Sequence, residues 1–145
     1  MKILALDIGE KRTGVAWGDT VSKIAIPIST LNTADILARP EKLRAVAAEH
    51  EAEVLLVGLP VSLDGQENSQ AIQVRKQAEM IAQKLALPLV FQDERLSSAE
   101  AKRYLREAGC TERQMRGKID MIAASLVLRT YLDSVLIDGR EMTQL

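Results

Sequence analysis

The stretch that decides the fold is ILALDIG at residues 3–9, which is followed by KRTGVAW at residues 11–17. The apolar residues before Asp7 predict a core strand that carries a carboxylate to one end of a sheet. Because an unpaired buried carboxylate is costly, we expect Asp7 to have a partner: a metal ion, a hydrogen-bond donor or a cation. The next question is which other residues come to this strand end.

The remaining chain is a series of short apolar strands and amphipathic helices. An opening meander of three strands, followed by alternating helices and strands, favours an α/β fold with one mixed five-stranded sheet and helices on its faces. The predicted strands cover residues 2–7, 12–18, 23–31, 54–58 and 88–93, and the predicted helices cover residues 40–50, 70–85, 97–108 and 119–133.

Composition limits the class of protein. The chain has 145 residues, of which 47% are hydrophobic, enough for one domain with a real core; we place that domain at 1–138 and a polar tail at 139–145. The formal net charge of −1 gives no overall attraction to nucleic acid or membrane. Cys110 is the only cysteine, which excludes an internal disulfide. Without a membrane-spanning or signal-like stretch, we expect a cytoplasmic protein with no membrane partner.

Acidic residues interrupt apolar elements at three places: Asp7 at the first strand, the pair Asp93 and Glu94 at the last strand, and Asp120 at the final helix. Ligand crevices form at strand ends in α/β sheets, and oxygen ligands suit Mg²⁺. Each acid alone also has an ordinary structural explanation, such as a turn or a favourable charge at a helix N-terminus. Spacing alone leaves open whether the three places meet.

Five motifs in order along the chain resemble one known family. They are DIGEKRTGVA at 7–16, VGLP at 57–60, DG at 64–65, DERLSS at 93–98, and KID at 118–120 followed by Ala123-Ala124. The set is similar to the YqgF family, also called RuvX or Holliday junction resolvase-like proteins. The resemblance covers nearly the whole chain and implies an RNase H-like fold akin to the RuvC resolvases.

The resemblance also implies a function and a site. Family members are described as nucleases that mature the 5′ end of pre-16S ribosomal RNA during ribosome biogenesis. Carried over residue by residue, the catalytic and metal-binding acids are Asp7, Glu94 and Asp120, with Mg²⁺ or Mn²⁺ as the cofactor. Asp93 stays an alternative to Glu94, since strand alternation sends the two to opposite sides. Glu10 departs from the family pattern and adds a negative charge that disfavours phosphate beside the cleft.

Basic residues near the proposed ligands are candidates for holding the substrate. Lys11 and Arg12 follow Asp7, while Arg116 and Lys118 precede Asp120, and all four are interpreted as contacts to backbone phosphates. The basic residues of the helix at 97–108 are interpreted mainly as a solvated face. Because aromatic residues make up only 3% of the chain, recognition by shape and backbone is expected rather than extensive stacking.

The leading hypothesis is therefore a metal-dependent endonuclease acting on structured RNA, a ribosomal RNA precursor, with ribosomal particles as further partners. Cleavage of branched DNA is a rival within the same class. A module that binds nucleic acid or the ribosome without turnover is a second class, because a fold does not fix a function. Nucleotide binding is a third, since Asp-x-Gly after a first strand also opens the actin and sugar-kinase type of ATPase, although those enzymes have two lobes.

Overall fold

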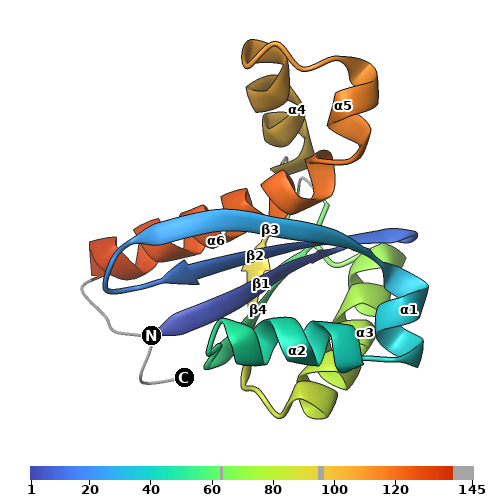
Figure 1. Cartoon of the computed structure of the whole chain (residues 1–145), viewed down its shortest axis with the longest axis vertical. Coiled ribbons are helices and arrows are strands. Elements are labelled where there is room, and N and C mark those ends of the chain that lie inside the picture. Colours follow the sequence, from blue (N-terminus) through green and yellow to red (C-terminus); the bar gives the residue numbers. More distant parts are fainter. Residues whose placement is uncertain (63, 95–96, 139–145) are drawn as a thin grey trace.

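A five-stranded mixed sheet forms the centre of the molecule (Figure 1). The computed structural model describes residues 1–62, 64–94 and 97–138. The strand order is β3-β2-β1-β4-β5, with antiparallel pairing among the first three strands of the chain and parallel pairing of β1 with β4 and of β4 with β5. The strands are β1 (Lys2–Ile8), β2 (Arg12–Asp19), β3 (Ile24–Asn32), β4 (Val54–Leu59) and β5 (Leu89–Asp93).

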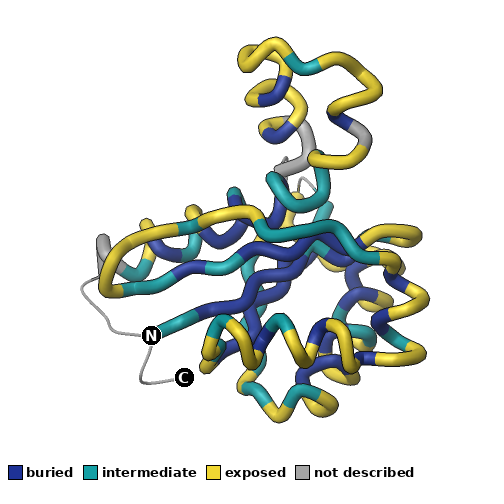
Figure 2. Tube along the Cα trace, in the orientation of Figure 1, coloured by how far each residue is buried: buried dark blue, intermediate teal, exposed yellow. Residues whose placement is uncertain are grey.

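One face of the sheet is covered by three helices, α1 (Thr33–Ala38), α2 (Glu41–Glu49) and α3 (Ser69–Leu85) (Figure 1). Side chains alternate along a strand, so Leu4, Leu6 and Ile8 of β1 all point to this face. They pack with one apolar stripe of α3, which includes Val74 and Ile81. Figure 2 shows the strands as a buried layer beneath these helices.

The other face is covered by α6 (Ile119–Asp138). Ile3 and Ala5 of β1 pack here against Val127 and Leu128 of the helix. Helices on both faces confirm the predicted RNase H-like arrangement. Within the described residues, no helix is long and apolar enough to cross a membrane.

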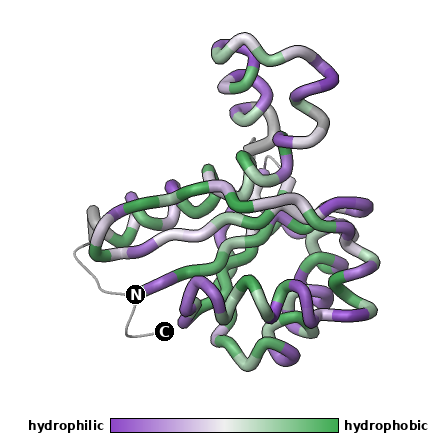
Figure 3. Tube along the Cα trace, in the orientation of Figure 1, coloured by the Kyte–Doolittle hydropathy of each residue, from purple (hydrophilic) through white to green (hydrophobic). Residues whose placement is uncertain are grey.

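A pair of helices, α4 (Ser97–Glu107) and α5 (Glu112–Arg116), projects beyond the end of the sheet (Figure 1). We call residues 97–116 the projection. Among the residues of the projection whose burial the structure describes, the buried apolar ones are Ala101, Leu105 and Met115. Hydrophilic residues are frequent along the projection (Figure 3).

Two helices were absent from the sequence prediction. Residues 33–38 form α1, a single short helix that Asn32 caps by accepting a hydrogen bond from the backbone N–H of Asp35 at 3.1 Å. The basic segment before the last helix contains α5, which begins with a capping box from Thr111 to Gln114. The final helix runs to Asp138, beyond the predicted end. The predicted tail at 139–145 lies outside the described residues.

Candidate functional site

Asp7 and Glu94 meet at the end of the sheet. Leu6 of β1 pairs with Val57 of β4, so the next residue, Asp7, lies beside Gly58. Gly58 pairs in turn with Gln92 of β5, two residues before Glu94. A Cβ atom on Gly58 would lie 2.6 Å from Oε2 of Glu94. The missing side chain thus provides the space in which Glu94 reaches across β4 and hydrogen-bonds Asp7.

Strand alternation explains why Glu94, and not Asp93, meets Asp7. Val90 packs in the core on the α6 side, whereas Phe91 packs in the core on the α3 side. Glu94 therefore continues the α6-side series, on which Asp7 also lies. Asp93 is exposed, and its charge raises the pKa of Glu94. The sequence left this choice open, and the geometry favours Glu94.

The two carboxyl groups share a proton. Burial is the main cause that raises the pKa of Glu94 to about 10, and the hydrogen bond to Asp7 and the charges of Asp7 and Asp93 add to it. Burial also raises the pKa of Asp7, opposed by the hydrogen bond from Glu94 and reinforced by the charge of Asp120. At neutral pH the carboxylic acid of Glu94 donates to the carboxylate of Asp7, as expected of two acids held together away from water.

Asp120 reaches the edge of the same site but pairs with a cation. It lies in the first turn of α6, and its Oδ2 accepts a hydrogen bond from Nε of Arg12 at 3.0 Å. The Asp120 side chain is 19% exposed and that of Arg12 is 55% exposed. The described part of the chain contains no group of three or more acidic, histidine or cysteine side chains placed to hold a metal ion. The structure therefore brings two of the three predicted acids into contact and holds the third on Arg12.

A tight turn between β1 and β2 carries Arg12. The backbone N–H of Gly9 donates to the carbonyl of Arg12 at 2.9 Å, and Thr33 at the start of α1 donates its hydroxyl to the carbonyl of Gly9 at 2.8 Å. The buried hydroxyls of Thr13 and Thr33 lie 2.8 Å apart, and the N–H of Thr33 donates to the carbonyl of Lys11 at 2.9 Å. Helix α1, which the sequence analysis missed, thus fixes the turn beside the acids.

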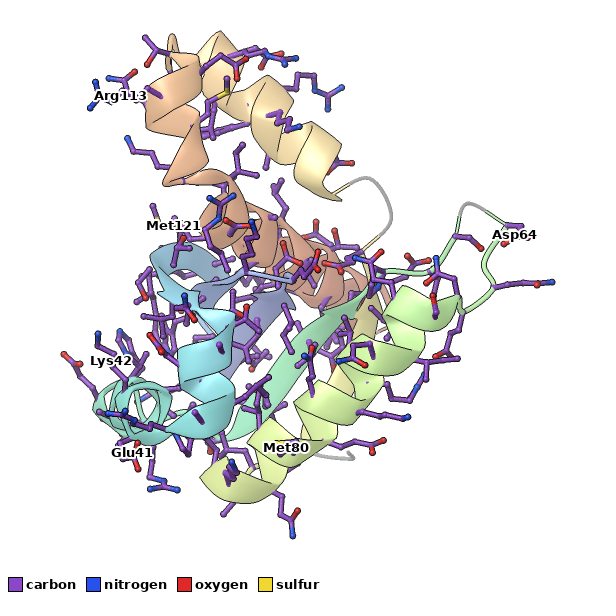
Figure 4. The ribbon with its side chains drawn as sticks, turned by 90° about the vertical axis from the view of Figure 1, so that its right-hand side faces the viewer. Glu41, Lys42, Asp64, Met80, Arg113 and Met121 are labelled. Carbon is purple, nitrogen blue, oxygen red and sulfur yellow. The ribbon has the colours of Figure 1, made fainter. Side chains whose placement is uncertain are left out.

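The predicted basic residues lie on both sides of the acids. Lys11 and Arg12 are exposed on the turn, and Lys118 is exposed just before α6. Arg116 ends α5, and its side chain lies outside what the structure describes. Figure 4 shows Met121 near the base of the projection and Arg113 toward its far end.

Two glycines were not identified as site residues from the sequence. Gly58 makes room for Glu94, and Gly14 lets the start of α6 approach β2, since a Cβ there would lie 1.8 Å from the backbone oxygen of Asp120. A glycine inside a strand pattern is a signal of close approach by another group. The sequence contained that signal at both positions, without saying what approaches.

The donor set fits a hard divalent cation. Asp7 and Glu94 offer oxygen atoms only. Two ionised carboxylates this close would repel each other, and either the proton between them or a bound cation removes that repulsion. Mg²⁺ is usually bound by one or two carboxylates together with waters and substrate phosphate oxygens. A pair of carboxyls with a third acid nearby, at an open sheet end, matches that requirement.

Comparison with known proteins identifies the family. The family model "RuvX: Holliday junction resolvase" matches residues 1–134. This chain belongs to the RuvX family. A relative from Thermosynechococcus vestitus, named "Putative pre-16S rRNA nuclease", is 40% identical over 92% of this chain and 89% of its own length. A relative of the same name from an Anaeromyxobacter species is 38% identical over 92% of this chain and 97% of its own length.

Solved structures similar to this RuvX-family chain have the same fold at low identity. RuvC of T. thermophilus in complex with a Holliday junction substrate is 13% identical, with a TM-score of 0.56 over 94% of this chain and 96% of that one. The Fowlpox virus resolvase in complex with Holliday junction DNA is 12% identical, with a TM-score of 0.61 over 94% of this chain and 99% of that one. These similarities confirm the RNase H-like fold.

Proposed function

We propose that this protein is a metal-dependent endonuclease that hydrolyses phosphodiester bonds near the 5′ end of pre-16S ribosomal RNA. The observation that carries the proposal is the half-buried carboxyl pair of Asp7 and Glu94 at the end of the sheet. The names of relatives that share 38–40% identity over most of the chain support the choice of substrate.

Asp7 and Glu94 would hold Mg²⁺ or Mn²⁺, and Glu94 would give up its proton when the cation binds. A bound divalent ion lowers the pKa of a water molecule and stabilises negative charge on phosphate oxygens. The described residues do the rest: Gly58 keeps the space for Glu94, and burial orients both carboxyls. In this account both acids contact the cofactor directly.

In this proposal Arg12 exchanges one anionic partner, Asp120, for another, a phosphate of the substrate. Its guanidinium is paired with Asp120 and still largely exposed, so an incoming phosphate offers it a second anionic partner. Guanidinium groups bind phosphate through paired hydrogen bonds. When Arg12 turns to the phosphate, Asp120 is released towards the Asp7–Glu94 pair. Substrate binding thereby completes the acidic set, with Lys11 and Lys118 adding positive charge nearby.

A module that only binds nucleic acid is the weaker candidate. Two buried carboxyls facing a polyanion disfavour binding, and their burial is costly without a proton or a cation. Such a pair is accounted for by metal chemistry and not by binding alone.

The test is a cleavage assay with purified protein in Mg²⁺ or Mn²⁺, on RNA spanning the 5′ end of 16S rRNA and on a four-way DNA junction. We expect the RNA to be cut. Asp7→Asn and Glu94→Gln should each lower the rate by more than about 100-fold, since even partners outside the ligand shell contribute about 10–100-fold. Asp93→Asn is the matched control and should stay within about threefold of wild type, as an exposed neighbour.

The outcomes separate the alternatives. Undiminished cleavage by Asp7→Asn would refute the mechanism. Cleavage of the junction alone would replace the RNA substrate with branched DNA. Absence of cleavage in any metal, together with tighter RNA binding by Asp7→Asn, would favour the binding module.

A further inference from the structure

A cavity of about 560 Å³ lies between the β1–β2 turn and the N-terminal half of α3, on the face of the sheet opposite Asp7. Ile8, which follows Asp7 directly, forms part of its wall. Alternation along β1 places Ile8 on the α3 side and Asp7 on the α6 side of the same strand end.

The lining combines amides, one carboxylate and apolar side chains. Gln70, Gln73 and Gln77 lie on one face of α3, and Glu10 lies opposite them on the turn. Among the described residues, none of these four side chains has a hydrogen-bond partner in the protein. Ile8 and Val74, both 3% exposed, form the apolar base of the cavity beneath these polar side chains.

This chemistry excludes a phosphate and suits a base. No described lining residue is cationic, and the charge of Glu10 repels phosphate. Glutamine amides pair with base edges, and carboxylates accept hydrogen bonds from exocyclic amino groups. Base edges in A-form duplexes are poorly accessible, whereas unpaired bases present their whole edge. The volume lies within the usual range of about 300–1,000 Å³ for small-molecule sites.

We propose that this cavity, which we call the base cavity, binds one unpaired nucleobase that carries an exocyclic amino group. The inference rests on the proposed function, because it takes the ligand to be part of the RNA that the protein binds. Glu10 accepts a hydrogen bond from the amino group, and the glutamines pair with the remaining edge of the base. Uracil has a carbonyl where cytosine has an amino group, so it places an acceptor against Glu10.

The experiment compares oligo(C) with oligo(U) RNA, which match in size and backbone charge. Binding of each to the full chain is measured by fluorescence anisotropy in EDTA, where no cleavage is expected. Wild type should bind oligo(C) about tenfold more tightly than oligo(U), the lower part of the range for one well-paired base. Glu10→Gln and Gln73→Ala should each bring this ratio close to unity. Gln83→Ala, near the other end of α3, is the matched control and should keep the ratio.

The readout is the ratio of the two affinities, because a general change in fold or charge alters the affinity for oligo(C) and for oligo(U) by the same factor. Equal affinities in wild type would overturn the base cavity, as would a ratio that survives both cavity variants. These results are independent of the nuclease proposal. RNA cleavage without the oligo(C) preference overturns the base cavity alone. The preference without cleavage overturns the nuclease proposal and leaves the base cavity as a binding site.

Discussion

Asp7 and Glu94 show how the environment of two ordinary residues gives them unusual chemistry. An exposed glutamate is ionised at neutral pH, but burial beside a second carboxyl holds Glu94 in its protonated form. Burial also raises the pKa of Asp7, whereas the hydrogen bond from Glu94 lowers it and favours Asp7 as the acceptor. In the proposed mechanism, a divalent cation takes the place of this shared proton.

The shared proton predicts how stability depends on pH in the metal-free protein. The pKa of Glu94 is 4.5 in an unperturbed chain and about 10 in the fold, so the folded state retains a proton that the unfolded state releases. Its contribution to stability is complete below about pH 4.5 and falls as pH rises towards about 10. For a single proton the slope is at most about 1.4 kcal/mol per pH unit.

Urea denaturation in EDTA, repeated between about pH 5 and pH 9, measures this slope. Glu94→Gln removes the titration and should flatten the dependence of the unfolding free energy on pH. The exposed neighbour gives a control, because Asp93→Asn should largely retain the wild-type slope. An unchanged slope in Glu94→Gln would contradict the shared proton.

The sequence predicted which residue types form the site better than it predicted their contacts. Asp7 could be placed at a strand end because the apolar run before it has no other interpretation. The choice between Asp93 and Glu94 needed the register of β5 against β4, which depends on tertiary pairing. The ion pair of Arg12 with Asp120 joins residues 108 positions apart, and no local pattern predicts such a contact.

The strands and the long helices follow from local pattern, whereas the short helices do not. Apolar runs and helical periodicity located all five strands and α2, α3, α4 and α6. Helix α1 has six residues and α5 has five, too short for periodicity to show. Their capping residues, Asn32 and Thr111, were the available signals.

Two glycines differ in how closely other atoms approach them, so alanine substitutions at these positions should lower stability by different amounts. A Cβ on Gly14 would lie 1.8 Å from the backbone oxygen of Asp120, so α6 would have to move as a whole. We expect Gly14→Ala to lower the unfolding free energy by about 3 kcal/mol or more. Gly117→Ala is the control, because no atom lies within 4 Å of a Cβ there and its φ of −87° is allowed. It should change stability by less than about 1 kcal/mol. Thermal and urea unfolding measure both.

Gly58→Ala should affect activity more than stability. The added Cβ would meet the flexible end of the Glu94 side chain at 2.6 Å, and that end can move. We expect a stability loss of about 1–3 kcal/mol and a cleavage loss of more than about tenfold, as Glu94 leaves Asp7. Full activity in a folded Gly58→Ala variant would contradict the role of Gly58.

The whole molecule is a near-neutral sheet domain that carries a hydrophilic, basic projection. Lys102, Arg103, Arg106 and Arg113 are all exposed on that projection, although the sequence reading treated most of them as an ordinary solvated face. Asp64 lies on the loop before α3, away from Arg113 (Figure 4). The projection therefore offers exposed cations that phosphate groups of a nucleic acid can contact.

Neutralising the projection should weaken RNA binding and its dependence on salt. In Arg103→Ala/Arg106→Ala, each lost phosphate contact should reduce the slope of log affinity against log salt by about 1. The melting temperature should be nearly unchanged, since both side chains are exposed. Lys42→Ala, on α2 far from Arg113, is the control (Figure 4). A slope equal to that of wild type would exclude the projection from the RNA interface.

The central claim is that Asp7 and Glu94 exchange their shared proton for a divalent ion. The most direct measurement is a crystal structure in Mn²⁺, with anomalous difference density to locate the metal. The account predicts an anomalous peak bound by the carboxylates of Asp7 and Glu94. Saturating Mn²⁺ with no peak at this pair, and Glu94 still hydrogen-bonded to Asp7, would contradict it.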